Sequence, residues 1–469
     1  MSHPLGRVFI VGIGGAGMSG LARLLHAQGA QVCGSDAKDS RRLQTLKAEG
    51  ISVFIGHYSS HIVGEDGQAL FDTIAASTAV PATNPELKKA GELGIKILNR
   101  AELLCALTDN YQVASVAGTH GKTTTTSMLT LALQSAALDP SFAIGSELNE
   151  SGSNAHLGSG EIFVVEADES DGTFLTLNTK IAIITNVEPD HLNYWQTFEK
   201  LEAAFLDFTK RAKSNGGVAV ICVDDAGGRK LAEQAKAADV QTKTYGINGD
   251  ADYQIKLLNH QKFGWSFELL NDGRSILKVD LKVPGKHNVL NASAAAIAAI
   301  ELGADVEGVV RGLEMFSGTR RRFEFKGSVN DVRVYDDYAH HPTEIAATLK
   351  AAREVVGDGK LIVAFQAHHY YRTALFSKEF GQSLGLADKV VVLEVFAPGE
   401  EFIPGSSGQT LADNVPLAKE KVIFEPSWSK VSEHLISTAS PGDIIMTLGA
   451  GEIGLLCPEI LEKLAAKSQ

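Results

Sequence analysis

Short apolar runs alternate with longer amphipathic stretches along most of the chain. The short runs are rich in β-branched residues and end in glycine or polar clusters, as buried strands do, whereas the longer stretches have helical periodicity. Alternation of this kind predicts an α/β protein whose parallel sheets are covered by helices. The expected strands are Gly6–Ile13, Gln31–Gly34, Val113–Val116, Ile162–Val165 and Ile181–Thr185, and runs within 332–345, 361–373, 390–401 and 443–454.

The first strand runs into a G-x-G-x-x-G turn, with glycines at 12, 14 and 17, and a helix is expected from there to about Gln28. The second strand leads to Asp36, near the spacing at which a dinucleotide-binding fold places its ribose-binding acid. Glycines let the backbone approach a pyrophosphate at a helix N-terminus, so a UDP-sugar fits this turn as well as NAD does. The predicted substrate-binding residues here are Gly14, Gly15, Ala16, Gly17 and Asp36.

The stretch Val113–Met128 has the character of a phosphate-binding loop. A β-branched run breaks into Gly-Thr-His-Gly-Lys-Thr, and a helix is expected over Thr124–Leu133. Backbone N–H groups and the helix dipole favour an anion there, Lys122 can reach the β- and γ-phosphates, and Thr123 offers a hydroxyl to Mg²⁺. The general P-loop pattern requires glycine where this chain has Val116. We predict the cofactors ATP and Mg²⁺, with the nucleotide at Gly118, Thr119, His120, Gly121, Lys122, Thr123 and Thr124.

Acidic side chains follow two further strands of the same region. Glu166 ends one strand and opens the acidic run to Asp171, and the next strand exits into Asn186-Val-Glu188-Pro-Asp190-His191. Acids at the carboxyl end of a strand beside a P-loop strand are placed to hold Mg²⁺. Glu166 is the preferred candidate, although each acid taken alone fits a solvated turn about as well.

Polar residues also gather at turns in the last third of the chain. Asn288 can cap an alanine-rich helix, but His287, Asn288 or Asn291 could equally meet a nucleotide base. The arginines before Phe323 could face phosphates or form a salt-bridged edge. Later strands end in Asp336, Asp337, His340 and His341, and in His368, His369 and Arg372. The second G-x-G-x-x-G match, Gly449–Gly454, is interpreted as a tight strand-to-helix turn.

Composition narrows the functional classes. A formal net charge of −13 argues against a general binder of nucleic acid or of membrane surfaces. The N-terminus has no signal-peptide pattern and no window reaches transmembrane length, which predicts a cytoplasmic protein. The scattered cysteines at 33, 105, 222 and 457 favour reduced buried thiols over a metal site or disulfides.

A length of 469 residues predicts about three domains, placed at 1–109, 110–314 and 315–469. The expected folds are Rossmann-like, P-loop-type mononucleotide-binding and Rossmann-like again.

The three domains together suggest a joining reaction, because they offer a pyrophosphate site, an ATP-Mg²⁺ site and a cluster of His, Asp and Arg side chains. In such a reaction a carboxylate takes the γ-phosphate of ATP, and the resulting acyl phosphate then reacts with an amine. Arg372 could grip an amino-acid carboxylate. Rival hypotheses are an NAD(P)-dependent oxidoreductase and a nucleotide-gated binding protein without ligation.

Several segments resemble one known family over essentially the whole chain. The sequence resembles the Mur ligases of peptidoglycan synthesis through these motifs: GIGGAGMSG, AGTHGKTTT, EADESD, TNVEPDH, GKHNVLNA, RRRFE, DDYAHHPTE and FQAHHYYRT. The resemblance implies that the three domains handle a UDP-sugar, ATP and an amino acid, with UDP-N-acetylmuramate and L-alanine as substrates. We expect a monomer or homodimer, and no nucleic-acid or membrane partner.

The resemblance also implies residue roles. Lys122 would bind phosphate, and Thr123, Glu166 and His191 would serve the metal sites. His287 and Asn291 would lie near adenine, and Arg322 and Asp336 near the ATP phosphates. His340 and Arg372 would meet the acceptor amino acid, and the implied catalytic set is Lys122, His191, His340 and Arg372.

The chain departs from the family pattern in the segment after Phe365, where Ala367 replaces a usual proline and His369 a usual arginine. Because that arginine is absent, we expect Arg372 to make the cationic contact with the acceptor amino acid. A related ligase that attaches a whole tripeptide to the same sugar nucleotide shares the phosphate loop, and it stays an alternative within the family.

Overall fold

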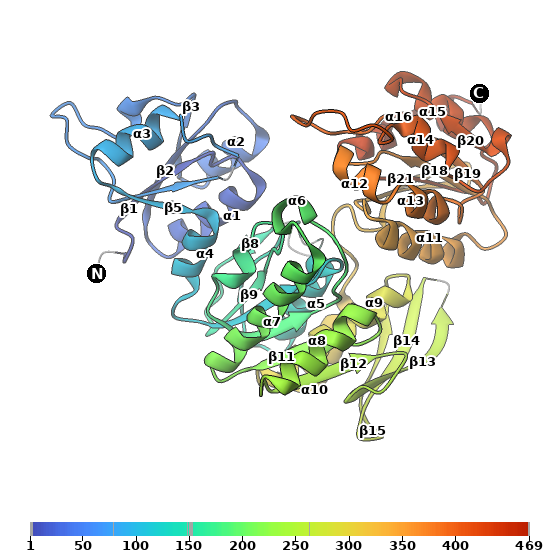
Figure 1. Ribbon diagram of the computed structural model, residues 1–469, viewed down its shortest axis with the longest axis horizontal. Coiled ribbons are helices and arrows are strands. Elements are labelled where there is room, and N and C mark those ends of the chain that lie inside the picture. The colour runs from blue at the N-terminus through green and yellow to red at the C-terminus, as the bar shows by residue number, and fades with distance from the viewer. Residues whose placement is uncertain (1–2, 78, 148, 150–152, 262, 468–469) are drawn as a thin grey trace. The chain divides into compact units, whose positions relative to one another are not determined.

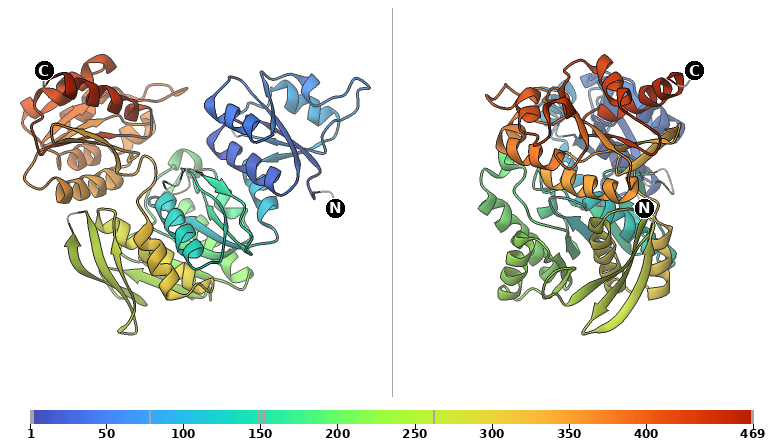
Figure 2. Two further views of the ribbon diagram at one scale, coloured as in Figure 1. Left: turned by 180° about the vertical axis from the view of Figure 1, so that it is seen from behind. Right: turned by 90° about the vertical axis from the view of Figure 1, so that its right-hand side faces the viewer.

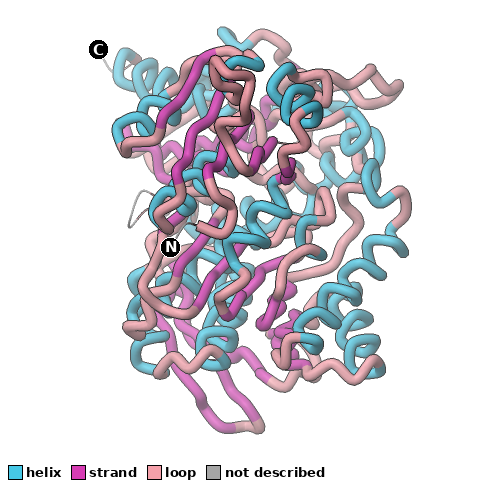
Figure 3. Tube along the Cα trace, turned by 90° about the vertical axis from the view of Figure 1, so that its left-hand side faces the viewer, coloured by secondary structure: helices cyan, strands magenta, loops and turns pink. Residues whose placement is uncertain are grey.

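The structure is a computed structural model that describes residues 3–77, 79–147, 149, 153–261 and 263–467. Strands and helices alternate through these residues, which confirms the predicted α/β class (Figure 3). The chain divides into two compact units, 1–253 with 294–312 and 254–293 with 313–469. This division groups residues differently from the three predicted domains, whose boundaries stay a prediction.

The N-terminal sheet of the first unit has five parallel strands in the order β3-β2-β1-β4-β5 (Figure 1). Val8 and Ile10 pack into one apolar cluster and Phe9 and Val11 into another, so both faces of β1 are covered. This explains the unbroken apolar run in the sequence. The elements are β1 (Arg7–Val11), α1 (Ala16–Ala27), β2 (Gln31–Asp36), α2 (Arg41–Ala48), β3 (Ser52–Ile55), η1 (Ser59–His61), β4 (Thr73–Ala76), α3 (Pro85–Glu92), β5 (Lys96–Asn99) and α4 (Arg100–Thr108).

The other strands of the first unit follow the order β12-β11-β10-β6-β9-β7-β8. β6 lies between β9 and β10 and is parallel to both, so the carboxyl ends of all three open on the same edge. The elements are β6 (Gln112–Ala117), α5 (Lys122–Ser135), β7 (Ser141–Ala143), β8 (Ala155–His156), β9 (Ile162–Glu166), η2 (Thr173–Leu175), β10 (Thr179–Ile184), α6 (Leu192–Trp195), α7 (Phe198–Ser214), β11 (Val218–Cys222), α8 (Ala226–Ala237) and β12 (Thr242–Gly246).

An Asp-Gly hairpin follows the strands described so far. β13 (Tyr253–Gln261) precedes β14 (Gly264–Asn271) and β15 (Arg274–Leu281), and the last two pair antiparallel as a ribbon (Figure 2). Asp272 and Gly273 both have positive φ, 48° and 73°, as a type I′ turn requires.

The interpretation of Asn288 as a helix N-cap is wrong. The helix α9 (Lys286–Glu301) begins two residues before Asn288. The Asn288 amide instead donates from inside the first turn to Pro284 O at 2.8 Å. After α9 the chain continues into α10 (Val306–Met315).

The C-terminal sheet has six strands in the order β16-β17-β21-β18-β19-β20. β16 is antiparallel to β17 and the other neighbours are parallel. After β21, Gly449–Gly454 forms a turn into helix, as predicted. The elements are β16 (Glu324–Val329), β17 (Val332–Asp337), α11 (Pro342–Val356), β18 (Leu361–Phe365), α12 (Tyr370–Leu375), α13 (Ser377–Leu384), β19 (Lys389–Val392), α14 (Gly408–Asp413), η3 (Lys419–Lys421), β20 (Val422–Phe424), α15 (Trp428–Ser437), β21 (Ile444–Leu448), η4 (Ile453–Leu455) and α16 (Leu456–Ala466).

All four cysteines are free thiols, as expected, but only Cys222 and Cys457 are buried. Within the described ranges, no helix combines the length and apolar character needed to cross a bilayer.

Candidate functional site

The predicted phosphate loop, Gly118–Thr123, joins β6 to α5. Gly121 occupies the N-cap position with a left-handed φ of 83°, and no side chain caps the helix. The helix begins two residues earlier than expected, at Lys122, so Lys122 and Thr123 belong to its first turn. N–H groups in the first turn of a helix have no acceptor within the helix and attract anions. The loop is therefore arranged to receive a phosphate group.

Lys122 is held by three acceptors of its own chain. Its Nζ donates to Gly118 O at 2.7 Å, to Thr119 O at 3.3 Å and to Glu169 Oε1 at 2.8 Å. Burial alone would lower the pKa of the Lys122 ammonium, but the charges of Glu169 and then Asp168 outweigh burial and raise it above its ordinary value. The ammonium thus stays charged, and Glu169 is a contact that the sequence reasoning did not single out.

Two of the predicted metal ligands are in contact. Thr123 Oγ1 donates to Glu166 Oε1 at 3.1 Å, and Glu166 Oε2 accepts from Gly145 N at 2.8 Å. A hydroxyl and a carboxylate beside a phosphate loop are the oxygen donors that Mg²⁺ prefers, so this pair fits the ion. The Nε2 of His191 lies 3.7 Å from Glu169 Oε1 and 3.6 Å from Asp190 Oδ2.

The first glycine loop, Gly12–Gly17, joins β1 to α1 at the place where the strand order reverses. Asp36 Oδ2 accepts from Gly14 N at 2.9 Å, so the predicted ribose acid also holds the loop. Gly15 is the N-cap of α1, which begins at Ala16 and has no side-chain cap. A Cβ on Gly17 would lie 2.6 Å from Arg100 Nε, which shows how closely this guanidinium packs on the turn.

Sequence reasoning missed Arg100, the first residue of α4. Among the described residues, its guanidinium has no hydrogen-bond or ion-pair partner, and it is only partly exposed. An unpaired guanidinium over the uncapped start of α1 adds positive charge where the motif expects a pyrophosphate. The only signal in the sequence was its position directly after Asn99, the residue that caps α4.

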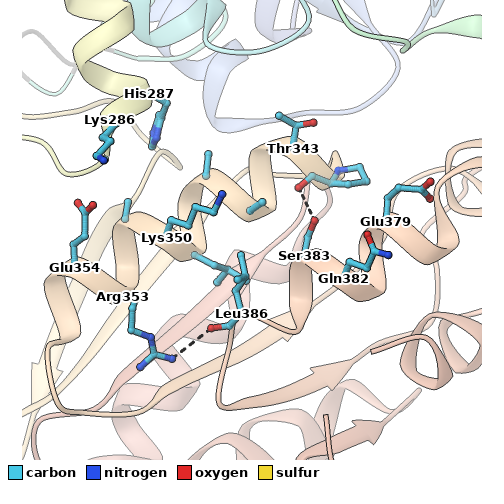
Figure 4. A pocket seen from close by; sticks show the side chains of 16 residues that line it. Lys286, His287, Thr343, Lys350, Arg353, Glu354, Glu379, Gln382, Ser383 and Leu386 are labelled. Atoms are coloured by element: carbon cyan, nitrogen blue, oxygen red, sulfur yellow. Dashed lines mark hydrogen bonds between the residues drawn. The ribbon is translucent and has the colours of Figure 1, made fainter. Parts of the chain in front are cut away.

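A pocket of about 950 Å³ lies in the second unit between the start of α9 and the helices α11 and α13 (Figure 4). His287 and Lys286 reach it from α9, and Thr343 and Lys350 from α11. Burial, then the charge of Arg322, lowers the pKa of His287 to about 4, so the ring is neutral at pH 7. The rest of the lining is mixed: apolar side chains of α11 stand beside the charged Lys286, Lys350 and Glu354. A neutral imidazole next to apolar side chains suits a flat heteroaromatic base.

The predicted adenine neighbour Asn291 is buried and donates to Asn288 Oδ1 at 3.2 Å. It does not line this pocket, whereas His287 does. The two residues lie one turn apart on α9, and their place near adenine stays a prediction.

The arginines before β16 point to different partners. Arg321 Nε donates to Asp336 Oδ2 at 3.0 Å, and its Nη2 to Gly449 O at 2.6 Å. Arg322 Nη1 lies 3.6 Å from Glu344 Oε1 and its guanidinium packs over the Tyr338 ring. Asp336, expected near phosphates, is buried and engaged by Arg321.

The predicted acceptor residues lie at the ends of β17 and β18. His340 Nδ1 is 3.1 Å from Tyr338 O and 3.2 Å from Glu344 Oε2. Arg372 on α12 is buried, and its Nη1 donates to His368 O at 3.4 Å. His369, the departure from the family pattern, pairs with Glu400 through its Nδ1.

Three family models match the chain. They are described as Mur ligase family, catalytic domain (residues 7–112), Mur ligase middle domain (116–299) and Mur ligase, glutamate ligase domain (321–451).

Curated relatives match over almost the full length. A UDP-N-acetylmuramate–L-alanine ligase from Saccharopolyspora erythraea is 50% identical and covers 99% of this chain and 94% of its own. The enzyme of the same name from Acidothermus cellulolyticus is 49% identical, over 99% and 96%.

Solved structures of similar ligases also superimpose on almost the whole chain. The UDP-N-acetylmuramate–alanine ligase of Thermotoga maritima superimposes with a TM-score of 0.80 at 28% identity, over 98% of this chain and 99% of its own. A murein peptide ligase from Psychrobacter arcticus has a TM-score of 0.70 at 26% identity, with the same coverage.

Proposed function

This chain belongs to the Mur ligase family, and we propose that it joins L-alanine to the carboxylate of UDP-N-acetylmuramate while ATP is converted to ADP and phosphate. The observation that carries the proposal is the 50% identity, over 99% of the chain, to a relative of that name. The reaction is a step in the synthesis of peptidoglycan precursors.

ATP is proposed to bind at the phosphate loop, with the γ-phosphate at Lys122. The ammonium already lies at the mouth of the loop, 2.7 Å from Gly118 O, so a phosphate oxygen would replace part of its present contacts. Phosphoryl transfer asks for positioning and charge neutralisation more than for covalent chemistry by the protein. Mg²⁺ held by Thr123 and Glu166 would supply part of that neutralisation.

The sugar nucleotide is proposed to bind at the first glycine loop, with its pyrophosphate between α1 and Arg100. Its carboxylate attacks the γ-phosphorus, ADP leaves, and an acyl phosphate forms. The amine of L-alanine then attacks the acyl carbon and phosphate departs. Arg372 is proposed to hold the alanine carboxylate and so to direct the amine, as a guanidinium fork can.

His287 is proposed to lie near adenine, as the family resemblance implies. Support comes from the low pKa of His287, which leaves a neutral ring that can accept a hydrogen bond from an exocyclic amine.

The test is mass detection of the product after the protein is mixed with ATP, Mg²⁺, UDP-N-acetylmuramate and an acceptor. We expect a UDP-N-acetylmuramoyl-alanine mass, with ADP and phosphate release that requires both substrates. ATP turnover that is independent of the sugar nucleotide would contradict the proposal.

A second candidate is a ligase that attaches a tripeptide, because the murein peptide ligase of Psychrobacter arcticus also superimposes over the whole chain. Supplying the L-alanine-led tripeptide in place of L-alanine separates the two candidates. We expect L-alanine to be the better acceptor by a wide margin.

A further inference from the structure

The phosphate loop is shorter than the general pattern, and this raises the question of what fixes its conformation. β6 ends at Ala117 and α5 begins at Lys122, so the connection is Gly118-Thr119-His120-Gly121. A connection of this length has little room for hydrogen bonds within itself. The neighbouring strand supplies them.

The chain that leaves β10 runs alongside the loop. Thr185 N donates to Ala117 O at 3.1 Å, and Thr119 N donates to Asn186 O at 3.3 Å. A Cβ on Gly118 would lie 2.1 Å from Thr185 Oγ1, so only glycine permits this approach. The segment Thr185–Glu188, which we name the brace, thus continues the pairing of β6 with β10 beyond the end of both strands.

Asn186 makes the most specific contact of the brace. Its Oδ1 accepts from His120 N at 2.9 Å, and its Nδ2 donates to His120 O at 3.0 Å. One carboxamide therefore pairs with both backbone groups of the residue before Gly121, in the manner of a partner strand, and the Thr185 hydroxyl donates to the same His120 carbonyl. This two-point contact fixes the orientation of the peptide groups on either side of His120.

A second reciprocal contact holds the other half of the loop. Thr119 Oγ1 accepts from Glu188 N at 2.9 Å and donates to Glu188 O at 3.2 Å. With Thr119 and His120 tied to the brace, the N–H groups at the start of α5 are left for an anion, because they have no acceptor within the helix. The brace therefore occupies the back of the loop and leaves its phosphate-facing side available.

We propose that Asn186 is the positioning residue of the phosphate loop: its carboxamide sets the peptide at His120 so that the N–H groups of Gly121, Lys122 and Thr123 converge on the nucleotide phosphates. Asn186 acts through the loop and not on the reacting atoms. The proposal rests on the proposed function insofar as the phosphates belong to ATP.

The test compares Asn186→Ala with the unaltered enzyme by calorimetric titration with ADP and with UDP-N-acetylmuramate. We expect ADP affinity to fall about tenfold or more, because two hydrogen bonds to backbone are lost and the loop must be ordered by the ligand. Affinity for the sugar nucleotide should stay within about twofold. In steady-state assays, KM for ATP should rise while KM for L-alanine does not.

Asn215→Ala is the matched control. The Asn215 amide donates to Thr179 O at 2.9 Å and to Arg211 O at 3.1 Å, the same kind of contact at the opposite end of β10. We expect Asn215→Ala to lower stability without moving ADP affinity. Equal loss of ADP affinity in both variants would mean a merely structural role and would overturn the proposal.

Asn186→Asp is the second variant, to be used if the alanine variant does not fold. It is nearly isosteric and keeps one acceptor for His120 N, but its other oxygen faces His120 O without a proton. ADP affinity should again fall about tenfold; affinity within twofold of the unaltered enzyme overturns the proposal. ADP binding does not depend on amide product, so a protein that binds ADP but fails to ligate disproves only the proposed function.

Discussion

Two loops of this protein share the spacing G-x-G-x-x-G, but they differ in the helix that follows and in the contacts of the nearby arginine. The first glycine loop, Gly12–Gly17, leads directly into the twelve-residue helix α1. The last glycine loop, Gly449–Gly454, follows β21 in the same way, but it leads into the three-residue η4 before α16 begins. Only the first loop therefore presents the start of a long helix.

Positive charge is also used differently at the two loops. At the last loop, Arg321 donates to Gly449 O at 2.6 Å and to Ala450 O at 3.3 Å. Its remaining nitrogen meets Asp336, whose Oδ2 lies 2.6 Å from where a Cβ on Gly454 would stand. At the first loop, Arg100 has no such partner among the described residues. At the last glycine loop the protein's own arginine thus binds the turn, whereas the first glycine loop leaves its arginine available for a ligand.

The largest effect is expected from Arg321→Ala. Asp336 is 2% exposed, so removing Arg321 leaves a buried carboxylate whose ion-pair partner is gone. We expect the free energy of unfolding to fall by about 3 kcal/mol. Urea denaturation measures it, and Arg100→Ala is the control, with a change below about 0.5 kcal/mol because its guanidinium has no partner to lose. Equal stability of the two variants would remove the contrast between the loops.

Arg100→Ala should instead change ligand binding. A charge-assisted hydrogen bond to a pyrophosphate is worth about 1.5–3 kcal/mol, so KM for UDP-N-acetylmuramate should rise about tenfold to a hundredfold. KM for ATP should not change, because the phosphate loop has its own cation in Lys122. Steady-state kinetics with each substrate varied in turn gives both values. A parallel rise in both KM values would show that Arg100 acts on the enzyme as a whole.

Gly17→Ala sharpens the same comparison. A Cβ there would lie 2.6 Å from Arg100 Nε and 3.3 Å from its Cζ, so the guanidinium must move away from the turn. We expect a smaller rise in KM for the sugar nucleotide, about threefold to tenfold, because a displaced arginine keeps part of its interaction. The double variant with Arg100→Ala should bind no worse than Arg100→Ala alone. If the two substitutions raised KM additively in the double variant, Gly17 would be needed for a reason other than its contact with Arg100.

The two loops also show which site residues can be predicted from the sequence. Lys122, Thr123 and Glu166 were identified from their places next to strands, because adjacent parallel strands bring such residues to one edge. Arg100 and Asn186 were not assigned roles, because their contacts join segments that are far apart in the chain. Which arginine of the run before Phe323 meets Asp336 depends on a positive φ of 58° at Arg321, and no periodicity predicts that.

A separate effect is expected in the pH dependence of stability near the last glycine loop. Asp337, whose backbone carbonyl accepts from Gly449 N at 3.1 Å, is buried, and burial raises the pKa of its carboxyl to about 6. The folded protein thus holds this proton more tightly than the unfolded chain does. Asp337 alone makes the free energy of unfolding fall as pH rises from about 4 to about 6.

His287 has the opposite effect, because its pKa is lowered to about 4 and the unfolded chain binds that proton more readily. Its contribution makes the free energy of unfolding rise with pH between about 4 and 6.5, so the two slopes largely cancel. Asp337→Asn removes one of them. Denaturation of both proteins at a series of pH values should show that the variant gains stability relative to the unaltered protein as pH rises from about 4 to about 6, by about 2 kcal/mol. A difference between the two proteins that does not change with pH would mean that Asp337 does not titrate as its burial indicates.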